Sequence, residues 1–305
     1  MSLESTAAEP AVSYRSIPVD GLDIFYREAG PKDGPTILLL HGLPSSSRMY
    51  QPLLESSLSE KYRLIAPDYP GFGHSSWPDH NDFAYTFDHL AKVMEDFAVQ
   101  LHLDRYSLFM QDYGGPVGFR MALAHPEKVN AMIIQNAVAH EEGLSPLWAV
   151  RRAFWLDRKA HETEVRTNLL SLEATKKRHV GTSPDVSLYN PDLWLDEYYF
   201  LNQPGQAAIQ LDLFYDYQNN VKSYPKWQQW LRDYKPPLLV IWGRYDTSFT
   251  VAGGEAYKRE NPEAEVHILD AGHFALDLRP EEIIRLTQSF CARKVAASMA
   301  AGQQE

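Results

Sequence analysis

The stretch FMQDYGGPVG, residues 109–118, joins an apolar, β-rich run to a glycine-rich segment that can begin a helix. Its one charged residue, Asp112, stands where the two meet and is followed by Tyr113 and two glycines. A sharp turn of this kind strains the backbone of its central residue, which small neighbours tolerate best. It also presents that side chain to the first amide of the next helix. We therefore predict a strand-to-helix elbow with Asp112 as a nucleophile, and a helix-capping aspartate is the alternative.

Short apolar runs recur on both sides of this elbow and alternate with amphipathic segments. Continuous apolar runs predict strands that are buried on both faces of a mainly parallel sheet covered by helices. Residues 15–30 predict an antiparallel hairpin around the turn Asp20–Gly21, and helices are expected after Thr86 and from Pro280. The predicted fold class is α/β, with a doubly wound sheet. The runs lie at residues 36–42, 63–68, 106–112, 130–137, 238–243 and 265–270.

The alternation stops near Ala139 and resumes near Pro236. The residues between hold five of the seven tryptophans and seven of the seventeen tyrosines. We predict a core made of residues 1–139 and 236–305 and a helical cap made of residues 140–235. The cap is expected over the carboxyl ends of the strands, where open sheets place their sites. An ordinary stretch of helical core is the alternative.

Composition excludes several classes of partner. The formal net charge of -11 argues against nucleic acid or an anionic membrane as the main partner. Cys291 is the single cysteine, so no intramolecular disulfide can form. No secretory signal is visible at the start, and no apolar stretch approaches the ~18 residues that span a bilayer. We expect a cytoplasmic monomer or homodimer that does not insert into membranes.

Two further polar residues follow apolar runs in the second half of the chain. Asp246 lies in WGRYDTSF and His273 in DAGHFAL. The order nucleophile, acid, histidine at successive strand ends predicts a catalytic triad with Asp112. The segment HGLPSSS, residues 41–47, follows the run at 36–40. Its Leu43 amide and the Tyr113 amide would together stabilise an oxyanion.

These motifs, together with DYPGFGHSS at residues 68–76, resemble the α/β-hydrolase fold from about Arg15 to about Phe290. An aspartate at the elbow is similar to the branch that contains epoxide hydrolases and haloalkane dehalogenases. A carboxylate gains little by attacking a carbonyl carbon, but it can displace a leaving group from saturated carbon and form an alkyl ester. His273, held by Asp246, would then activate water to hydrolyse that ester. This chemistry needs no cofactor and no metal.

In the haloalkane dehalogenases of this branch, the group that the aspartate displaces from carbon is a halide. Dehalogenases of the branch usually have a tryptophan after the nucleophile and a second donor from tryptophan or asparagine. This chain has Tyr113 and Leu43 at those positions, so Trp148 or Trp155 of the expected cap would have to substitute. The pair Met110–Gln111 before the nucleophile is closer to the elbows of dehalogenases than to the Gly-His pair found in many epoxide hydrolases.

Epoxide hydrolases of this fold instead use two cap tyrosines that donate to the ring oxygen. Tyr217, in LFYDYQNN, matches one of them. The other would fall in LDEYYFLNQPG, where Glu197 is nearest the expected place and Tyr198 lies beside it. The leading hypothesis is hydrolysis of an apolar or aromatic epoxide, for which an aromatic cap is suited. Dehalogenation is the alternative, and a non-catalytic ligand-binding homologue is a third possibility.

Overall fold

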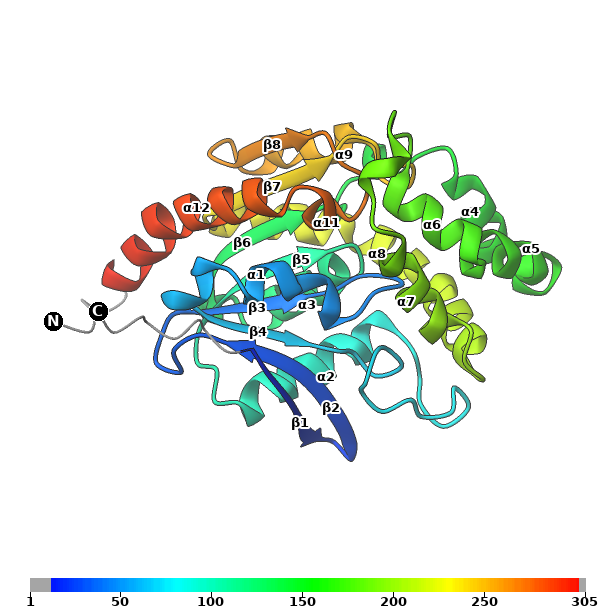
Figure 1. Cartoon of the computed structure of the whole chain (residues 1–305), viewed down its shortest axis with the longest axis horizontal. Helices are drawn as coiled ribbons and strands as arrows, with labels where there is room; N and C mark the ends of the chain where they lie inside the picture. Colours follow the sequence, from blue (N-terminus) through cyan, green and yellow to red (C-terminus); the bar gives the residue numbers. More distant parts are fainter. Residues whose placement is uncertain (1–11, 302–305) are drawn as a thin grey trace, which may run out of the picture.

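The computed structural model describes residues 12–301, with side chains described up to residue 294. Its centre is an eight-stranded sheet with the order β1-β2-β4-β3-β5-β6-β7-β8 (Figure 1). β1 and β2 form the predicted antiparallel hairpin, and β3 to β8 are parallel to one another. The predicted α/β fold with a mainly parallel sheet is therefore confirmed. The strands are β1 (Ser13–Val19), β2 (Leu22–Ala29), β3 (Thr36–Leu40), β4 (Arg63–Pro67), β5 (Tyr106–Gln111), β6 (Val129–Gln135), β7 (Leu238–Gly243) and β8 (Glu265–Leu269).

The sheet separates two apolar cores, because successive side chains of a strand point to opposite faces. In β3, Leu38 and Leu40 belong to one core, and Ile37 and Leu39 belong to the other. β3, β5, β6 and β7 are buried along their whole length, as their continuous apolar runs predict. The first core lies under helices α2 (Phe87–Gln100) and α3 (Gly114–Ala124), and the second lies under α1 (Gln51–Leu54), α11 (Ala275–Leu278) and α12 (Pro280–Ala301).

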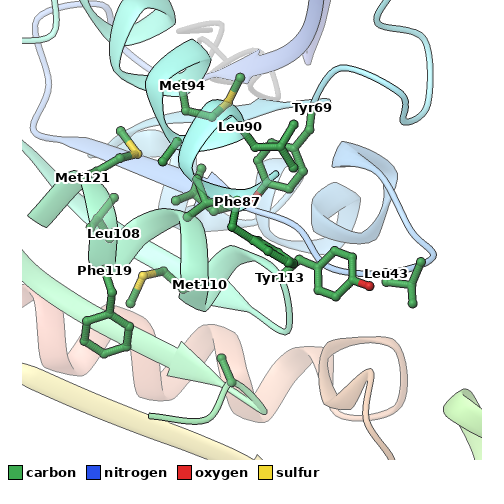
Figure 2. Packing of buried hydrophobic residues seen from close by; sticks show 14 of the residues in the cluster. Leu43, Tyr69, Phe87, Leu90, Met94, Leu108, Met110, Tyr113, Phe119 and Met121 are labelled. Carbon is green, nitrogen blue, oxygen red and sulfur yellow. The ribbon is translucent and has the colours of Figure 1, made fainter. Parts of the chain in front are cut away.

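Helix α2 begins where the sequence predicts it. The hydroxyl of Thr86 accepts a hydrogen bond from the His89 N–H at 3.2 Å, which satisfies one of the free amides of the first turn. α2 then packs its apolar face against α3 and β5. Figure 2 shows Phe87, Leu90 and Met94 of α2 in one packed group with Leu108 and Met110 of β5 and Phe119 and Met121 of α3.

Residues 140–235 form mainly helices, which gather at one end of the sheet (Figure 1). Their helical character agrees with the sequence pattern, whereas the division into a core and a cap stays a prediction. The first eleven residues of the predicted core lie outside the described residues.

Two short helices, α9 (Val251–Glu255) and α10 (Tyr257–Glu260), follow β7. The helices between β6 and β7 are α4 (Trp148–Leu156), α5 (Arg158–Leu170), α6 (Leu172–Val180), α7 (Pro191–Leu201) and α8 (Gln206–Tyr234).

In the part of the chain that the structure describes, no helix has both the length and the apolar character needed to cross a bilayer.

Candidate active site

Asp112 lies between the end of β5 and the start of α3, in the predicted elbow. Its φ of +48° places it in the left-handed region, which residues with a side chain rarely adopt. The glycine at 114 permits this turn, because a Cβ there would lie 2.0 Å from the carbonyl oxygen of Leu40. Asp112 is only 7% exposed, and its side chain lines a pocket. The backbone strain predicted for the elbow is therefore confirmed.

The loops after β7 and β8 bring the other two predicted residues to Asp112. His273 Nε2 lies 3.6 Å from Asp112 Oδ2, and His273 Nδ1 lies 2.6 Å from Asp246 Oδ2. The parallel strands β5, β7 and β8 end at the same edge of the sheet, which is why residues far apart in the chain meet there. The contacts run in the order Asp112, His273, Asp246, which is the order that the sequence predicts for a nucleophile, a base and an orienting acid.

Asp246 is held by three donors. Its Oδ1 accepts from the backbone N–H groups of Ser248 at 2.7 Å and Phe249 at 3.1 Å. Its Oδ2 accepts from Asn136 Nδ2 at 2.9 Å. Asn136 is itself fixed, because its Oδ1 accepts from the Gly243 N–H at 2.8 Å. Sequence reasoning missed Asn136, although a polar residue directly after the apolar strand β6 was the signal that could have found it.

Burial raises the pKa of the Asp112 carboxyl, and the charge of His273 and the amides of Leu43 and Tyr113 oppose this rise. The Leu43 N–H donates to Asp112 Oδ1 at 2.8 Å. Burial also disfavours the charged form of His273, but the neighbouring Asp246 carboxylate outweighs it and raises the pKa of His273. The Asp246 carboxylate thus favours the charged form of His273, whereas burial favours the neutral form of Asp112.

The turn that carries Leu43 is fixed by Asp68. The Asp68 carboxylate accepts from the Ser47 N–H at 2.6 Å and from the His74 N–H at 2.8 Å. Beside it, burial lowers the pKa of His41 to about 4, so this histidine is neutral and accepts from the Tyr69 N–H at 3.2 Å. These contacts hold the Leu43 amide against the Asp112 carboxylate.

The pocket contains Tyr217 but not Tyr198. Tyr217, on α8, is buried, and its hydroxyl has no partner within 3.5 Å among the described residues, although burial and the neighbouring Tyr224 hydroxyl raise its pKa. Tyr198 is half-buried on α7, and the Glu197 carboxylate beside it pairs with His179 at 2.7 Å. The structure therefore brings one predicted tyrosine to the nucleophile and leaves the other outside. The pocket is lined by Leu43, Asp112, Tyr113, Trp148, Arg151, Arg178, Phe214, Tyr217, Ser248 and His273.

Tyr113 supplies a second hydroxyl to this pocket. Its ring packs edge-on against Phe87, with the ring centroids 4.8 Å apart, and Figure 2 shows its hydroxyl directed toward Leu43. That hydroxyl is buried and lacks a hydrogen-bond partner within residues 12–294. The rings of Tyr113 and Tyr217 lie 6.0 Å apart. Two phenols therefore face the same small space beside Asp112.

The two tryptophans considered as halide donors have no free indole N–H. Trp148 Nε1 donates to the Ser248 carbonyl at 3.0 Å, and Trp155 Nε1 donates to the Phe214 carbonyl at 2.8 Å. Binding a halide through either indole would first require breaking one of these hydrogen bonds.

Arg151 and Arg178 also line the pocket, on α4 and α6. Nothing in the sequence marked them. Arginines on amphipathic helices are usually solvated, and their position depends on how the helices between β6 and β7 pack.

A mainly parallel eight-stranded sheet, an elbow after β5, and an acid and a histidine after β7 and β8 are together the features of the α/β hydrolases. The family model described as the alpha/beta hydrolase fold matches residues 35–280. The chain belongs to this family, and it is an α/β-fold hydrolase.

The relatives include several kinds of hydrolase. An uncharacterized hydrolase of Saccharomyces cerevisiae is 38% identical over 276 residues, which cover 88% of this chain and 94% of the yeast protein. A haloalkane dehalogenase of Psychrobacter cryohalolentis is 36% identical over 281 residues, covering 88% of this chain and 87% of the relative. The solved structure of the epoxide hydrolase CorEH superposes with a TM-score of 0.74 at 17% identity, over 93% of this chain and 99% of that one. At this identity the superposition shows a shared fold alone.

Proposed function

We propose that this hydrolase forms an alkyl ester on Asp112 and opens epoxides to diols. The observation that carries the proposal is the pair of buried hydroxyls of Tyr113 and Tyr217, which line the pocket of Asp112 with no partner among the described residues. An epoxide oxygen needs such donors as its bond to carbon breaks. Tyr113 takes the place that the sequence assigned to Tyr198, which lies outside this pocket.

In the first step the Asp112 carboxylate attacks an epoxide carbon, the carbon–oxygen bond of the ring breaks, and the ring oxygen takes a proton from a tyrosine. Burial raises the pKa of both Tyr113 and Tyr217 well above 10, so both phenols are protonated at neutral pH. Their hydrogen bonds strengthen as negative charge develops on the oxygen. The product of this step is an ester between Asp112 and the opened substrate.

In the second step His273 takes a proton from water, and the water oxygen attacks the carboxyl carbon of the ester. The Leu43 and Tyr113 amides stabilise the resulting oxyanion. As the tetrahedral species collapses, the diol leaves with the proton from His273. The regenerated carboxylic acid of Asp112 ionises, and the phenolate recovers a proton. Because the negative charge of Asp112 raises the pKa of His273, ester formation lowers that pKa and leaves more of His273 in the neutral form that can accept a proton.

We further propose that residues 140–235 act as a cap over this site. The support is that Trp148 and Arg151 of α4, Arg178 of α6, and Phe214 and Tyr217 of α8 all line the pocket of Asp112. They would form the wall opposite the nucleophile and keep water from the first step.

Dehalogenation is the second candidate, favoured by the relative from Psychrobacter cryohalolentis that bears this name and is 36% identical. It uses the same nucleophile, base and acid, and differs only in the donors to the leaving group. The indole N–H groups of Trp148 and Trp155 already donate to backbone carbonyls, which disfavours dehalogenation. A non-catalytic ligand-binding homologue is the third candidate, and it would retain its ligand affinity in Asp112→Asn.

The test is a matched panel of epoxides and alkyl halides, with diol and halide measured on the purified protein. Diol formation is expected from the wild type and not from Asp112→Asn. Tyr217→Phe and Tyr113→Phe should each slow single-turnover ester formation by about tenfold or more, with little change in substrate binding. Tyr199→Phe, an exposed tyrosine on α7, is the control. Halide release without any diol formation would reverse the order of the two candidates.

A further inference from the structure

Two guanidinium groups stand in the wall of the pocket that holds Asp112. Arg151 is only 8% exposed, and Arg178 has a buried Nη1 with no hydrogen-bond partner among the described residues. The charge of Asp112 acts on both arginines. A pocket suited to a purely apolar epoxide would gain nothing from one buried and one half-buried cation.

Neither guanidinium is neutralised by a carboxylate. Within residues 12–294, no Asp or Glu oxygen lies within the 4.0 Å of an ion pair from either group. Arg151 instead lies over the ring of Trp148, 4.3 Å from its centroid, and Arg178 Nη2 donates to the Leu169 carbonyl at 2.5 Å.

The neighbouring arginines outside the pocket behave differently. Arg152 on the same helix as Arg151 pairs with Glu141 at 3.0 Å, and Arg158 on α5 pairs with Asp212 at 2.6 Å. The missing partners are therefore a feature of the pocket and not of this helical region in general.

Burying such cations is costly. Burial, together with the charge of Arg178, lowers the pKa of Arg151 to about 10. Burial likewise lowers the pKa of Arg178. A buried charge without a partner destabilises a fold, and a cost of this kind is retained mainly where function requires it. Since no carboxylate lies within 4.0 Å of either guanidinium among the described residues, both cations are available to pair with an anionic ligand.

A second, larger cavity adjoins the first through the arginines. Its volume is about 240 Å³, against about 20 Å³ for the cavity beside Asp112, and both are lined by Arg151, Arg178 and Ser248. Lys177 adds a further cation, and the apolar side chains of Leu147, Val150 and Leu169 complete much of the wall. An anionic group between the two arginines would thus place the rest of its molecule within reach of Asp112 or of the apolar cavity.

We propose that the substrate carries a carboxylate held by Arg151 and Arg178, so that the enzyme opens the epoxide of an organic acid. The proposal rests on the epoxide-opening function above and names its substrate class. Carboxylates suit this site because a guanidinium donates two parallel hydrogen bonds that match their two oxygens. The bound carboxylate would supply the missing negative charge and fix the position of the epoxide carbon relative to Asp112.

The test compares 3-phenylglycidate with its primary amide, which has the same skeleton and epoxide but no charge. The wild type is expected to favour the acid in kcat/KM by about tenfold to a hundredfold, the contribution of one or two charge-assisted hydrogen bonds. Arg151→Met and Arg178→Met should each lower this acid-to-amide ratio by about tenfold. Arg152→Met removes a neighbouring arginine outside the pocket and should leave the ratio unchanged. The lysine variants of Arg151 and Arg178 should restore part of it.

Several outcomes would overturn the proposal. Equal kcat/KM for acid and amide would remove anion recognition and leave the epoxide-opening function intact. An equal loss on both substrates in the arginine variants would mean that the arginines act only through the ionisation of Asp112. Chloride that inhibits as strongly as 3-phenylpropionate would mean that the arginines hold a small leaving anion.

Binding of unreactive probes separates the two proposals and does not depend on turnover. 3-Phenylpropionate should bind the wild type more tightly than 3-phenylpropionamide by calorimetry, and the difference should shrink in Arg178→Met. If the wild type binds 3-phenylpropionate more tightly but opens no epoxide, the proposed epoxide hydrolysis is wrong and the proposed recognition of carboxylates is supported. If the two probes bind equally, acid recognition fails. Should a methionine variant not fold, this comparison in the wild type still decides.

Discussion

Asp112 has to remain ionised in a place that disfavours charge. Burial raises the pKa of its carboxyl, whereas attack on an epoxide carbon requires the carboxylate. The Leu43 amide at 2.8 Å, the Tyr113 amide and the charge of His273 all favour the ionised form. Because the same amides would receive the oxyanion of the second step, the groups that stabilise the nucleophile also serve the hydrolysis of its ester.

The division of labour between Asp112 and His273 can be tested at this scale. In the proposed mechanism His273 has no part in ester formation, since the carboxylate needs no base, but it activates the water that follows. In His273→Gln an adduct should therefore form on Asp112 and persist. Mass spectrometry of the variant after incubation with a turned-over epoxide would detect it, with peptide mapping to locate it. A variant without added mass, or with the mass on another residue, would disprove the alkyl-enzyme mechanism.

At the scale of the elements, the elbow depends on how closely α3 approaches β3. Alanine is normally preferred to glycine inside a helix by about 1 kcal/mol. At position 114, however, an added Cβ would lie 2.0 Å from the Leu40 carbonyl oxygen, and a backbone atom cannot move aside cheaply. The start of α3, the Tyr113 amide and Asp112 would all have to shift together.

Gly114→Ala is expected to lose about 1–3 kcal/mol of unfolding free energy through overpacking. It should also lose at least about tenfold in kcat/KM, because small misplacements of reacting groups are costly. Gly21→Ala is a control that adds backbone strain without a clash, since its φ is +80° and no atom lies within 4 Å of the added Cβ. It should lose stability without losing turnover. Full activity in Gly114→Ala would show that the elbow tolerates the shift.

At the scale of the whole molecule, a buried charge cluster joins the helices between β6 and β7 to the rest of the fold. His179 of α6 contacts Glu197 of α7 at 2.7 Å and Asp277 of α11 at 3.4 Å. Glu197 also pairs with Arg48 at 3.1 Å. Burial opposes the charge on His179, but Glu197 and Asp277 outweigh it and raise the pKa of His179 to about 9. His179 and Arg48 in turn lower the pKa of Glu197 against the effect of burial.

This cluster predicts how stability depends on pH. A histidine whose pKa is higher in the folded than in the unfolded state stabilises the fold fully below the unfolded value of about 6.5. That contribution, on the order of a few kcal/mol, should be lost as the pH rises toward about 9. The contribution of Glu197 runs the other way and is lost as the pH falls below its usual range.

Chemical denaturation of the wild type and His179→Gln between pH 6 and 9.5 would measure the effect. The difference in unfolding free energy between the two proteins should shrink steadily across this range. His161→Gln, which removes an exposed histidine on α5, is the control and should run parallel to the wild type. A constant difference between His179→Gln and the wild type would mean that His179 is not charged in the folded protein.

The sequence by itself determined the sheet and the residues at its carboxyl edge. Every apolar run predicted as a strand forms one and ends within two residues of the expected place, because burial on both faces requires uninterrupted apolar side chains. Asp112, Asp246 and His273 could be named because each lies within four residues after such a strand, and parallel strands end at one edge.

Only the tertiary structure decided which groups complete the pocket. Tyr113, Arg151 and Arg178 face Asp112, while Tyr198 does not, and the N–H groups of Trp148 and Trp155 are already engaged. These facts depend on how the helices between β6 and β7 turn and pack against the strand ends. A helical pattern reveals which residues share a face, but the partner of that face is set by long-range contacts that no local pattern contains.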